Sequence, residues 1–328
     1  MRHIAGAAEP PHADYDADVL ILALDRPEET VAAIESALAQ QGLRLHVTVL
    51  DQGSHPANLE ALARHVGFRS DVTLASLGEN IGIAAGRNRA AAMGHGRIII
   101  GLDNDAVFDR PDTLVSAIRA IDADPRLGAI GFRIVVHATG ADDLLAWGYP
   151  RQLLCRASEV FDSATFVGAG HAIRRAAWEE AGGYDETLFF CWEEFDFCLR
   201  AIAFGWNIRY HGDIVVRHKT APERRLDWAG GRWFLFVRNR LYIARKHRTS
   251  WLGLVPRIAA YTAKGLRNGL GTETLRAIGA AVRMQPTREA VRGQREIRAY
   301  LNRVDSRHRG GAWRRIRGEV LVGLPGGT

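Results

Sequence analysis

Short apolar runs alternate with helix-like segments over residues 19–136 of this chain of 328 residues, and this alternation constrains the fold more than any other feature. The apolar runs indicate buried strands at residues 19–24, 45–50, 71–76, 98–102 and 127–136. The helix-like segments between them cover residues 25–42, 57–66, 77–94 and 109–122. Such strand–helix units connect by right-handed crossovers into a mainly parallel sheet that helices flank on both faces. The sequence therefore predicts a Rossmann-like α/β fold.

Acidic residues stand at the ends of the predicted strands. Asp25 follows the first strand, where it is also a candidate helix cap, and Asp51 follows the second; Asp103 and Asp105 follow the most apolar strand, in "RIIIGLDNDAVF". Ligands of parallel sheets bind beyond the carboxyl ends of the strands. Two carboxylates one residue apart suit a hard divalent cation that also binds phosphate oxygens. The alternative, in which the pair caps the next helix, is weaker because Asp109 already stands at that cap.

Charge is distributed unevenly along the chain. Residues 1–215 contain 18 Lys or Arg and 30 Asp or Glu, whereas residues 216–328 contain 25 and 7, so the net charge of +6 is the sum of −12 and +18. A basic segment of this kind predicts an anionic partner, such as phosphates or acidic lipid headgroups. Apolar residues at 232–248 and 251–270 recur at helical spacing, which indicates either amphipathic helices on an anionic membrane or packing on the main body. The sequence has no nucleic-acid-binding motif, so nucleic acid is not an expected partner.

The chain divides into three predicted parts. Residues 1–18 are expected to form a flexible polar arm, residues 19–220 the α/β domain, and residues 221–328 a basic helical region. The arm lacks the apolar stretch of a signal peptide, and no run reaches the roughly 18 apolar residues that span a bilayer. Three cysteines are too few for a disulfide framework or a zinc site, which favours a reducing compartment. We therefore expect a cytoplasmic protein, soluble or peripheral at the inner face of the plasma membrane.

Six motifs occur in one order along the chain: "VLDQGS", "ENIGIAAGRN", "LDNDAVF", "VGAGHAIRRAAWEEAGGYDE", "FFCWEEFDFCLRA" and "VVRHK". Through them, over about residues 19–246, the sequence resembles an inverting family-2 glycosyltransferase of the GT-A fold, of the rhamnosyltransferase-like kind. The resemblance implies transfer from a UDP- or dTDP-sugar to a hydroxyl of a saccharide, lipid-linked or small-molecule acceptor, in polysaccharide, glycolipid or glycosylated-metabolite biosynthesis. It also implies a nucleotide-binding half, residues 19–136, and an acceptor-binding half, residues 137–220.

The resemblance assigns a set of residues to the nucleotide sugar. They are Asp25, Asp51, Asn80, Gly82, Arg87, Asn88, Asp103 and Asn104. For Asp25 and Asp51 the alternative role is to cap the helix or turn that follows. The glycine-rich turn in "GENIGIAAGRN" lets the backbone approach a ligand, but it lacks the spacing of a dinucleotide fingerprint or a P-loop.

A divalent metal and a catalytic base are implied as well. Asp105 of the DxD motif and His218 of "VVRHK" would bind Mn²⁺ or Mg²⁺, and an imidazole among oxygen ligands suits Mn²⁺ better. An inverting transferase needs a carboxylate that takes the proton of the attacking hydroxyl. Glu194 stands where the family's usual Glu-Asp-x-Asp pattern has the catalytic Asp, and Glu193 is the alternative.

The acceptor and the transferred sugar are expected to lie against small, aromatic and acidic side chains. These are Gly168, Ala169, Gly170, Trp192 and Glu193. Aromatic side chains stack on sugar faces but more often belong to the core, so only Trp192, next to the acidic pair, is a site candidate. Acidic residues also favour the first turn of a helix, and Asp196 fits that simpler role as an i,i+4 partner of Arg200.

Two other functions use similar features. A sugar nucleotidyltransferase would carry a glycine-rich phosphate loop with Lys or Arg after the first strand, where this chain has "ALDRPEET". A non-catalytic nucleotide-sugar-binding module would bind the donor and tolerate the loss of Glu194. The series of acidic motifs favours the glycosyltransferase over both.

Overall fold

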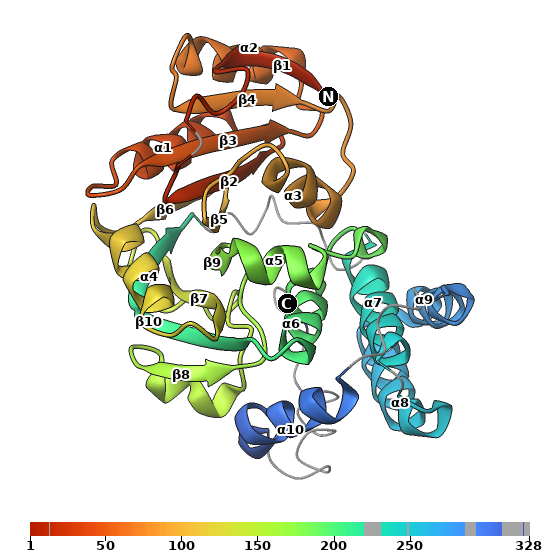
Figure 1. Cartoon of the computed structure of the whole chain (residues 1–328). Helices are drawn as coiled ribbons and strands as arrows, with labels where there is room; N and C mark the ends of the chain where they lie inside the picture. The colour runs from red at the N-terminus through yellow and green to blue at the C-terminus, as the bar shows by residue number, and fades with distance from the viewer. Residues whose placement is uncertain (13, 220–230, 248, 286–292, 310–323, 325–328) are drawn as a thin grey trace.

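A ten-stranded sheet flanked by helices forms the body of the protein, with a group of C-terminal helices beside it (Figure 1). The computed structural model describes residues 1–12, 14–219, 231–247, 249–285, 293–309 and 324. The strands are β1 (Arg2–Gly6), β2 (Ala17–Ala23), β3 (Leu45–Asp51), β4 (Val72–Ser76), β5 (Ile98–Asp103), β6 (Ala106–Phe108), β7 (Leu127–Val136), β8 (Val160–Ser163), β9 (Gly170–Arg174) and β10 (Asn207–His218). Their order across the sheet is β1-β4-β3-β2-β5-β9-β7-β10-β6, and β8 pairs with β10.

The sheet is built from two parallel groups. β4, β3, β2 and β5 pair in parallel, and β7 pairs in parallel with β10. β9 runs antiparallel between β5 and β7 and joins the groups. The predicted fold class is confirmed; the antiparallel strands β1, β6, β8 and β9 are additions that the strand–helix alternation did not indicate.

Helices cover both faces of the sheet. These are α1 (Pro27–Leu38), α2 (Pro56–Val66), α3 (Ile83–Ala91), α4 (Thr113–Asp122), α5 (Arg175–Ala181) and α6 (Glu193–Ala203). The C-terminal helices are α7 (Trp233–Lys246), α8 (Trp251–Arg267), α9 (Gly271–Arg283) and α10 (Gln294–Val304). One apolar core lies against α1, α2 and α4, and a second lies against α3, α5 and α6. Strand β5 contributes Ile98 and Ile100 to the first core and Ile99 to the second. Because successive strand residues point to opposite faces, a strand covered on both sides has to be apolar throughout.

The predicted flexible arm at residues 1–18 is wrong in two places. Arg2–Gly6 forms β1, which pairs antiparallel with β4, and β2 begins at Ala17, earlier than predicted. Between them Tyr15 is buried. Arg2–Gly6 forms a strand because β4 offers it unpaired backbone groups at the edge of the sheet. No pattern within residues 1–18 reports the presence of that edge.

The predicted helix cap at Asp25 is also wrong. The residue at the cap position of α1 is Arg26, in the left-handed conformation with φ 53°, and no side chain caps the helix there. The carboxylate of Asp25 instead accepts hydrogen bonds from the backbone N–H of His55 at 2.9 Å and from the side-chain amide of Asn58 at 2.8 Å. The β2–α1 connection is therefore fastened to the β3–α2 connection.

The described part of the basic C-terminal region is helical, as predicted. α7, α8 and α9 share a small core of their own, which includes Trp233, Leu254 and Ala277. α10 packs on the body, where the hydroxyl of Tyr300 accepts the backbone N–H of Ile208 at 2.8 Å. No helix in the described ranges has both the length and the apolar character to cross a bilayer. The predicted boundary at residues 220–221 and most of the chain after residue 309 lie outside the described residues.

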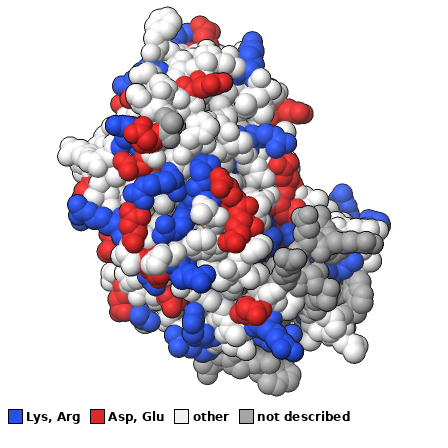
Figure 2. All heavy atoms as spheres, viewed as in Figure 1, with Lys and Arg blue, Asp and Glu red and all other residues white. Residues whose placement is uncertain are grey.

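Acidic and basic side chains are interspersed on the face of the molecule shown in Figure 2. In the described chain, acidic and basic side chains also pair across elements, as Arg97 does with Asp122 at 2.7 Å and Arg209 with Asp124 at 3.0 Å. The acidic excess of residues 1–215 therefore does not produce a uniformly acidic surface on this face.

Candidate active site

A cleft of about 990 Å³ opens beyond the carboxyl ends of β2 and β5. The β2–α1 connection, the β5–β6 turn, the loop before β9 and the start of α6 contribute to its wall. The sequence-predicted residues that line it are Asp25, Arg87, Asp103, Asn104, Asp105, Gly168, Ala169, Trp192, Glu193, Glu194 and His218. The fold thus brings residues of both predicted halves of the α/β domain into one cavity, at the edge where this sheet type binds ligands.

Two carboxylates and an imidazole meet at one end of the cleft. One ligand atom each from Asp103, Asp105 and His218 lies within 4.8 Å of the others. Asp103 ends β5, and the antiparallel pairing of β6 with β10 sets His218 opposite Ala106, next to Asp105. A set of carboxylate oxygens and one imidazole nitrogen fits a divalent cation such as Mn²⁺. This end is called the metal end below.

Asp143 orients the histidine of the metal end, and no sequence motif indicated this residue. Its Oδ2 lies 2.8 Å from Nδ1 of His218, which leaves Nε2 of the ring facing Oδ1 of Asp105 at 3.3 Å. The backbone N–H of Leu145 holds the same carboxylate, donating to Oδ1 at 3.0 Å. Burial alone would lower the pKa of His218, but Asp105 and Asp143 raise it to about 9. Carboxylates behind a ligating histidine fix its ring and its tautomer in metal sites.

Two arginines neutralise the carboxylates of the metal end. Arg26 contacts Asp105 with its Nη1 at 2.5 Å from Oδ2. The buried Arg87 donates from Nη2 to Asp103 at 2.8 Å and to the carbonyl of Gly168 at 2.8 Å. Arg87 was predicted to contact the donor, whereas Arg26 was not, because "DRPEE" indicates only a helix start. Both arginines line the cleft beside these carboxylates, and phosphate is a group that Arg binds well.

The other end of the cleft contains Glu193 and Glu194, in the first turn of α6. Glu193 is 3% exposed, and its Oε2 has no hydrogen-bond partner among the described residues. Burial, reinforced by the charge of Glu194, raises the pKa of Glu193 well above its usual range. Burial also raises the pKa of Glu194 to about 7. This end is called the glutamate end below.

Gly168 connects the two ends. Its carbonyl accepts the hydrogen bond from Arg87, and a Cβ on its Cα would collide with Oε1 of Glu194. A contact path therefore runs from Asp103 through Arg87 and Gly168 to Glu194. A side chain at this position would displace the carboxylate of Glu194, which occupies the space that a Cβ would fill.

Strained backbone marks both ends of the cleft. Of the five non-glycine residues that the described chain holds at positive φ, four line the cleft: Asp25, Arg26, Cys191 and Trp192. Each such residue costs about 1–3 kcal/mol, and such strain concentrates at functional sites. The strain lies at the starts of α1 and α6, the helices whose first residues form the cleft wall.

Trp192 and Asp196 lie on opposite sides of the start of α6, one toward the cleft and one away from it. Trp192 lines the cleft, and its indole N–H donates to the carbonyl of Phe236 at 3.1 Å. Asp196 points away from the cleft to Arg200 at 2.9 Å and Lys246 at 2.8 Å. The predicted i,i+4 pair is therefore confirmed, and Asp196 belongs to the framework of the helix.

Asp51 and Gly170 lie outside the cleft, although both were predicted as site residues. Asp51 is fully buried; its carboxylate accepts the backbone N–H of Ser54 at 3.0 Å and of Gly53 at 3.2 Å, and the hydroxyl of Ser76 at 2.6 Å. The structure thus displays the turn-capping alternative for Asp51. Gly170 is buried within β9. Contact of either residue with a substrate stays a prediction.

Three residues of the glycine-rich turn also have structural partners. Asn80 accepts the backbone N–H of Gly82 at 2.9 Å, and a Cβ at Gly82 would meet the carbonyl oxygen of Phe189 at 2.5 Å. The side chain of Asn88 donates to the carbonyl of Tyr184 and accepts its N–H, both at 2.9 Å. The turn therefore brings α3 close to the segment before α6, and only Arg87 of this predicted group reaches the cleft.

Comparison with known proteins places the chain in a family. Residues 18–182 match the family described as Glycosyl transferase family 2. The chain belongs to this family. It is a glycosyltransferase, as the motif series indicated, and the matched segment includes the metal-end carboxylates and ends before α6.

Two curated relatives align with parts of this glycosyltransferase. Over 116 residues it is 37% identical to the succinoglycan biosynthesis protein ExoO of Rhizobium meliloti (strain 1021), an alignment that covers 35% of this chain and 32% of ExoO. Over 169 residues it is 27% identical to an uncharacterized protein of Haemophilus influenzae, which covers 50% of this chain and 90% of that protein. The chain thus spans about a third of the length of ExoO.

Solved structures share the GT-A fold. The mannosyltransferase PcManGT from Pyrobaculum calidifontis, in complex with GDP-Man and Mn²⁺, aligns with a TM-score of 0.56 at 17% identity over 96% of this chain and 87% of that one. GalNAc-T7 with UDP, GalNAc and Mn²⁺ aligns with a TM-score of 0.61 at 16% identity over 80% and 54%. At these identities the likeness concerns the fold, and it confirms the predicted GT-A architecture.

Proposed function

We propose that this glycosyltransferase moves a sugar, with inversion at the anomeric carbon, from a UDP- or dTDP-sugar to a hydroxyl of a saccharide, lipid-linked or small-molecule acceptor. One observation carries the proposal: a single cleft has metal ligands and arginines at one end and a carboxylate with a pKa of about 7 at the other. The names of the two solved neighbours support the donor class, because both were studied with a nucleoside-diphosphate compound and Mn²⁺.

The metal end would hold the diphosphate of the donor. Asp103, Asp105 and His218 would bind the divalent cation, Mn²⁺ or Mg²⁺. By the family resemblance, Asp103 would also lie beside the ribose. A cation held there supplies positive charge that stabilises the departing nucleoside diphosphate. Arg26 and Arg87 add fixed positive charge at the same place. Asn104 and Asp25 line this part of the cleft and offer hydrogen bonds to the nucleoside.

The glutamate end would activate the acceptor. The oxygen of the acceptor hydroxyl attacks the anomeric carbon while the bond from that carbon to the diphosphate oxygen breaks, and the electron pair leaves with the diphosphate. Glu194 takes the hydroxyl proton, and attack opposite the leaving group inverts the configuration. With a pKa of about 7, Glu194 is largely ionised at slightly alkaline pH and still basic enough for this transfer. Glu193 has a pKa well above its usual range, so it would keep its proton.

The acceptor would enter beside Gly168, Ala169 and Trp192, which line the glutamate end. We infer that it is presented at the cytoplasmic face of a membrane. Leu252, Leu266 and Leu275, on α8 and α9, are between 66% and 85% exposed, and apolar side chains of this kind on a basic helical region suit an anionic interface. In this proposal residues 19–220 catalyse the transfer and residues 221–328 carry the membrane contact.

The donor half of the proposal is tested by calorimetric titration of UDP, dTDP and GDP, with and without Mn²⁺, into wild type and Asp105→Asn. The expected result is Mn²⁺-dependent binding of a pyrimidine diphosphate that Asp105→Asn abolishes. Asp109→Asn is the matched control, because Asp109 pairs with Arg217 at 2.5 Å and does not line the cleft. Binding that is indifferent to both Mn²⁺ and Asp105 would reject the metal end.

Inversion is tested without knowledge of the acceptor. Slow transfer of the sugar to water releases a free sugar, and proton NMR identifies its anomer before mutarotation. The expected product has the configuration opposite to that of the donor and is lost in Glu194→Gln. A product that retains the donor configuration contradicts the inverting mechanism.

A further inference from the structure

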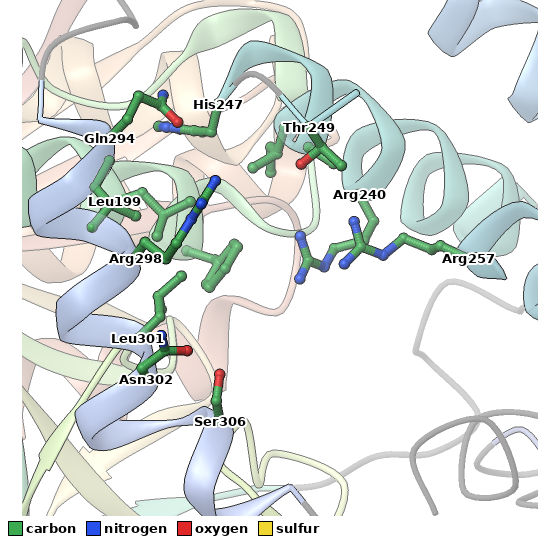
Figure 3. Close-up of a pocket in the computed structure, with 14 residues that line it drawn as sticks. Leu199, Arg240, His247, Thr249, Arg257, Gln294, Arg298, Leu301, Asn302 and Ser306 are labelled. Carbon is green, nitrogen blue, oxygen red and sulfur yellow. The ribbon is translucent and has the colours of Figure 1, made fainter. Parts of the chain in front are cut away.

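A second pocket, of about 220 Å³, lies outside the cleft among α6, α7, α8 and α10 (Figure 3). Its polar wall consists of Arg240, His247, Thr249, Arg257, Gln294 and Arg298, with Asn302 and Ser306 at one side. Phe195 lines both this pocket and the cleft, so the two cavities share a wall at the start of α6.

Three guanidinium groups reach the pocket from three different helices. Arg240 comes from α7, Arg257 from α8 and Arg298 from α10, and Figure 3 shows the ends of Arg240 and Arg257 side by side. Within the ranges that the structure describes, none of the three forms an ion pair with a carboxylate. Asp305, on the neighbouring turn, pairs with Arg309 at 2.6 Å. The pocket therefore gathers positive charge that the described residues do not neutralise.

Of the three arginines, Arg240 is the one that packs against aromatic rings of the cleft wall. Its guanidinium lies over the rings of Phe195 and Trp192, with 4.6 Å and 5.2 Å to the ring centroids. Burial, together with the charge of Arg257, lowers the pKa of Arg240 to about 10. Ring faces attract a cation but supply no hydrogen-bond acceptor in the guanidinium plane. Arg240 has no hydrogen bond to another described residue, so its N–H groups can donate to an anion.

Two further polar atoms of the pocket lack partners. Nδ1 of His247 and the amide nitrogen of Gln294 are buried, and neither has a hydrogen-bond partner in the described part of the chain. The other ring nitrogen of His247 is fixed by Oδ1 of Asp196 at 3.3 Å, so the ring cannot turn away without losing that contact. Buried polar groups in folded proteins are nearly always satisfied, by protein, water or ligand. The side-chain amide of Gln294 is therefore a buried donor that an anion in this cavity can satisfy.

We propose that this pocket binds a phosphate group. A phosphate offers several acceptor oxygens and up to two negative charges in a volume that the cavity accommodates, and planar guanidinium groups match its edges. The phosphate could be free, carried by a soluble sugar phosphate, or part of a lipid headgroup. Because Arg240 stacks on Trp192, which lines the glutamate end, an occupied pocket would hold that wall of the acceptor side in place. The proposal that an acceptor uses this pocket rests on the proposed function. The proposal that the pocket binds phosphate is independent of it.

The first test is calorimetric titration of sodium phosphate into the full chain, in a chloride buffer without divalent metal. Wild type is compared with the double variant Arg257→Gln/Arg298→Gln and with Arg295→Gln, which removes an exposed arginine of α10 that does not line the pocket. We expect one site in wild type and in Arg295→Gln, and at least about tenfold weaker binding in the double variant, since each lost bond is charge-assisted. No binding to wild type, or equal binding to all three proteins, would overturn the proposal. UDP with Mn²⁺, titrated into the same samples, reports on the cleft separately.

A second variant keeps the test informative if the double variant fails to fold. Asn302→Asp places a carboxylate at the rim of the pocket, next to the arginines. We expect phosphate to raise the Tm of wild type, and we expect Asn302→Asp to have a higher Tm that phosphate no longer changes. A Tm of Asn302→Asp that still rises with phosphate as in wild type contradicts the assignment.

The source of the phosphate is distinguished by two further probes. Glucose 1-phosphate is titrated in solution, and phosphatidylcholine vesicles with and without phosphatidic acid are used for co-sedimentation. Binding of glucose 1-phosphate that needs Arg257 and Arg298 assigns the pocket to a soluble or acceptor phosphate. Retention on phosphatidic acid vesicles that needs the same two arginines and not Arg295 assigns it to a lipid headgroup.

Discussion

The two ends of the cleft use carboxylates in opposite ways. At the metal end Asp105 faces His218 and Arg26, and Asp103 faces Arg87, so every acid has a cationic partner. At the glutamate end Glu193 has an oxygen with no partner among the described residues. All four groups are carboxylates, so their chemistry is the same and only their surroundings differ. Surroundings that supply cationic partners suit a carboxylate to metal binding, whereas burial without such partners suits it to proton transfer.

The directions of the pKa shifts express this difference. Burial alone would raise the pKa of Asp105, but His218 and Arg26 outweigh it and lower the pKa, so the group is ionised and ready for a cation. Burial raises the pKa of Glu194, and Arg87 offsets only part of the effect. Arg87 lies between the ends and serves both, because it contacts Asp103 directly and influences Glu194 through space.

The largest expected effect is that of Glu194→Gln. The amide keeps the shape of the side chain but cannot accept the hydroxyl proton, so kcat should fall by about 10²–10⁴-fold while Mn²⁺-dependent binding of the nucleotide is unchanged. Sugar transfer and calorimetric titration measure the two quantities on the same preparation.

Glu193→Gln is the matched control for that variant. Burial and the charge of Glu194 raise the pKa of Glu193 well above its usual range, which favours the neutral acid, and glutamine imitates a neutral carboxylic acid. Activity should therefore remain within a few-fold of wild type. A loss in Glu193→Gln together with an active Glu194→Gln would exchange the roles of the two residues.

Gly168→Ala should have the next largest effect, since it breaks the link between the two ends. The new methyl group collides with Oε1 of Glu194, and a displacement of about 1 Å at a reacting group costs about 10²-fold in rate. We expect this loss in kcat, with little change in nucleotide affinity. Gly148→Ala, which also lines the cleft but meets only the side chain of Val167 at 3.1 Å, should stay close to wild type.

Asp143→Asn should weaken the metal end without touching the glutamate end. Loss of the carboxylate behind a metal-ligating histidine lowers metal affinity by about 10–100-fold. The affinity is measured by titration of Mn²⁺ in the presence of saturating UDP. Asp142→Asn provides the control, because Asp142 pairs with Arg133 at 2.7 Å and does not contact His218. Equal Mn²⁺ affinity in wild type and Asp143→Asn would remove Asp143 from the metal site.

The carboxylates of the metal end were more predictable from the sequence than Asp143, which orients His218. Asp103 and Asp105 follow a strand that is apolar on both faces, so their position at the carboxyl edge follows from the sheet type. Asp143 lies in the connection after β7, where no periodic pattern exists, and it reaches His218 only because β7 and β10 pair in parallel. A contact that depends on strand pairing across long stretches of chain leaves no local signal.

Residue type alone does not decide whether a polar group serves the structure, a ligand or both. Asp51 and Asn88 occupy positions in recognisable motifs, yet in this structure their polar atoms are used by neighbouring backbone. β1 shows the same limit at the level of the fold, because its partner is an edge that forms only after β4 is in place. The second pocket is a further case, since its arginines lie on three helices and meet only in the tertiary structure.

The smallest expected effect is the change of kcat/KM with pH. It tests the difference between the metal end and the glutamate end most directly. Glu194 acts as a base only when it has lost its proton, and its pKa is about 7. The ionised fraction therefore decreases as the pH falls through 7, and at pH 6 kcat/KM should be about tenfold below its alkaline plateau. Asp105 of the metal end does not contribute to this limb, because its cationic partners His218 and Arg26 hold its pKa below its usual value. The residual activity of Glu194→Gln should be flat over the same range. A limb that persists unchanged in Glu194→Gln would show that another group titrates, and the division of labour between the two ends would fail.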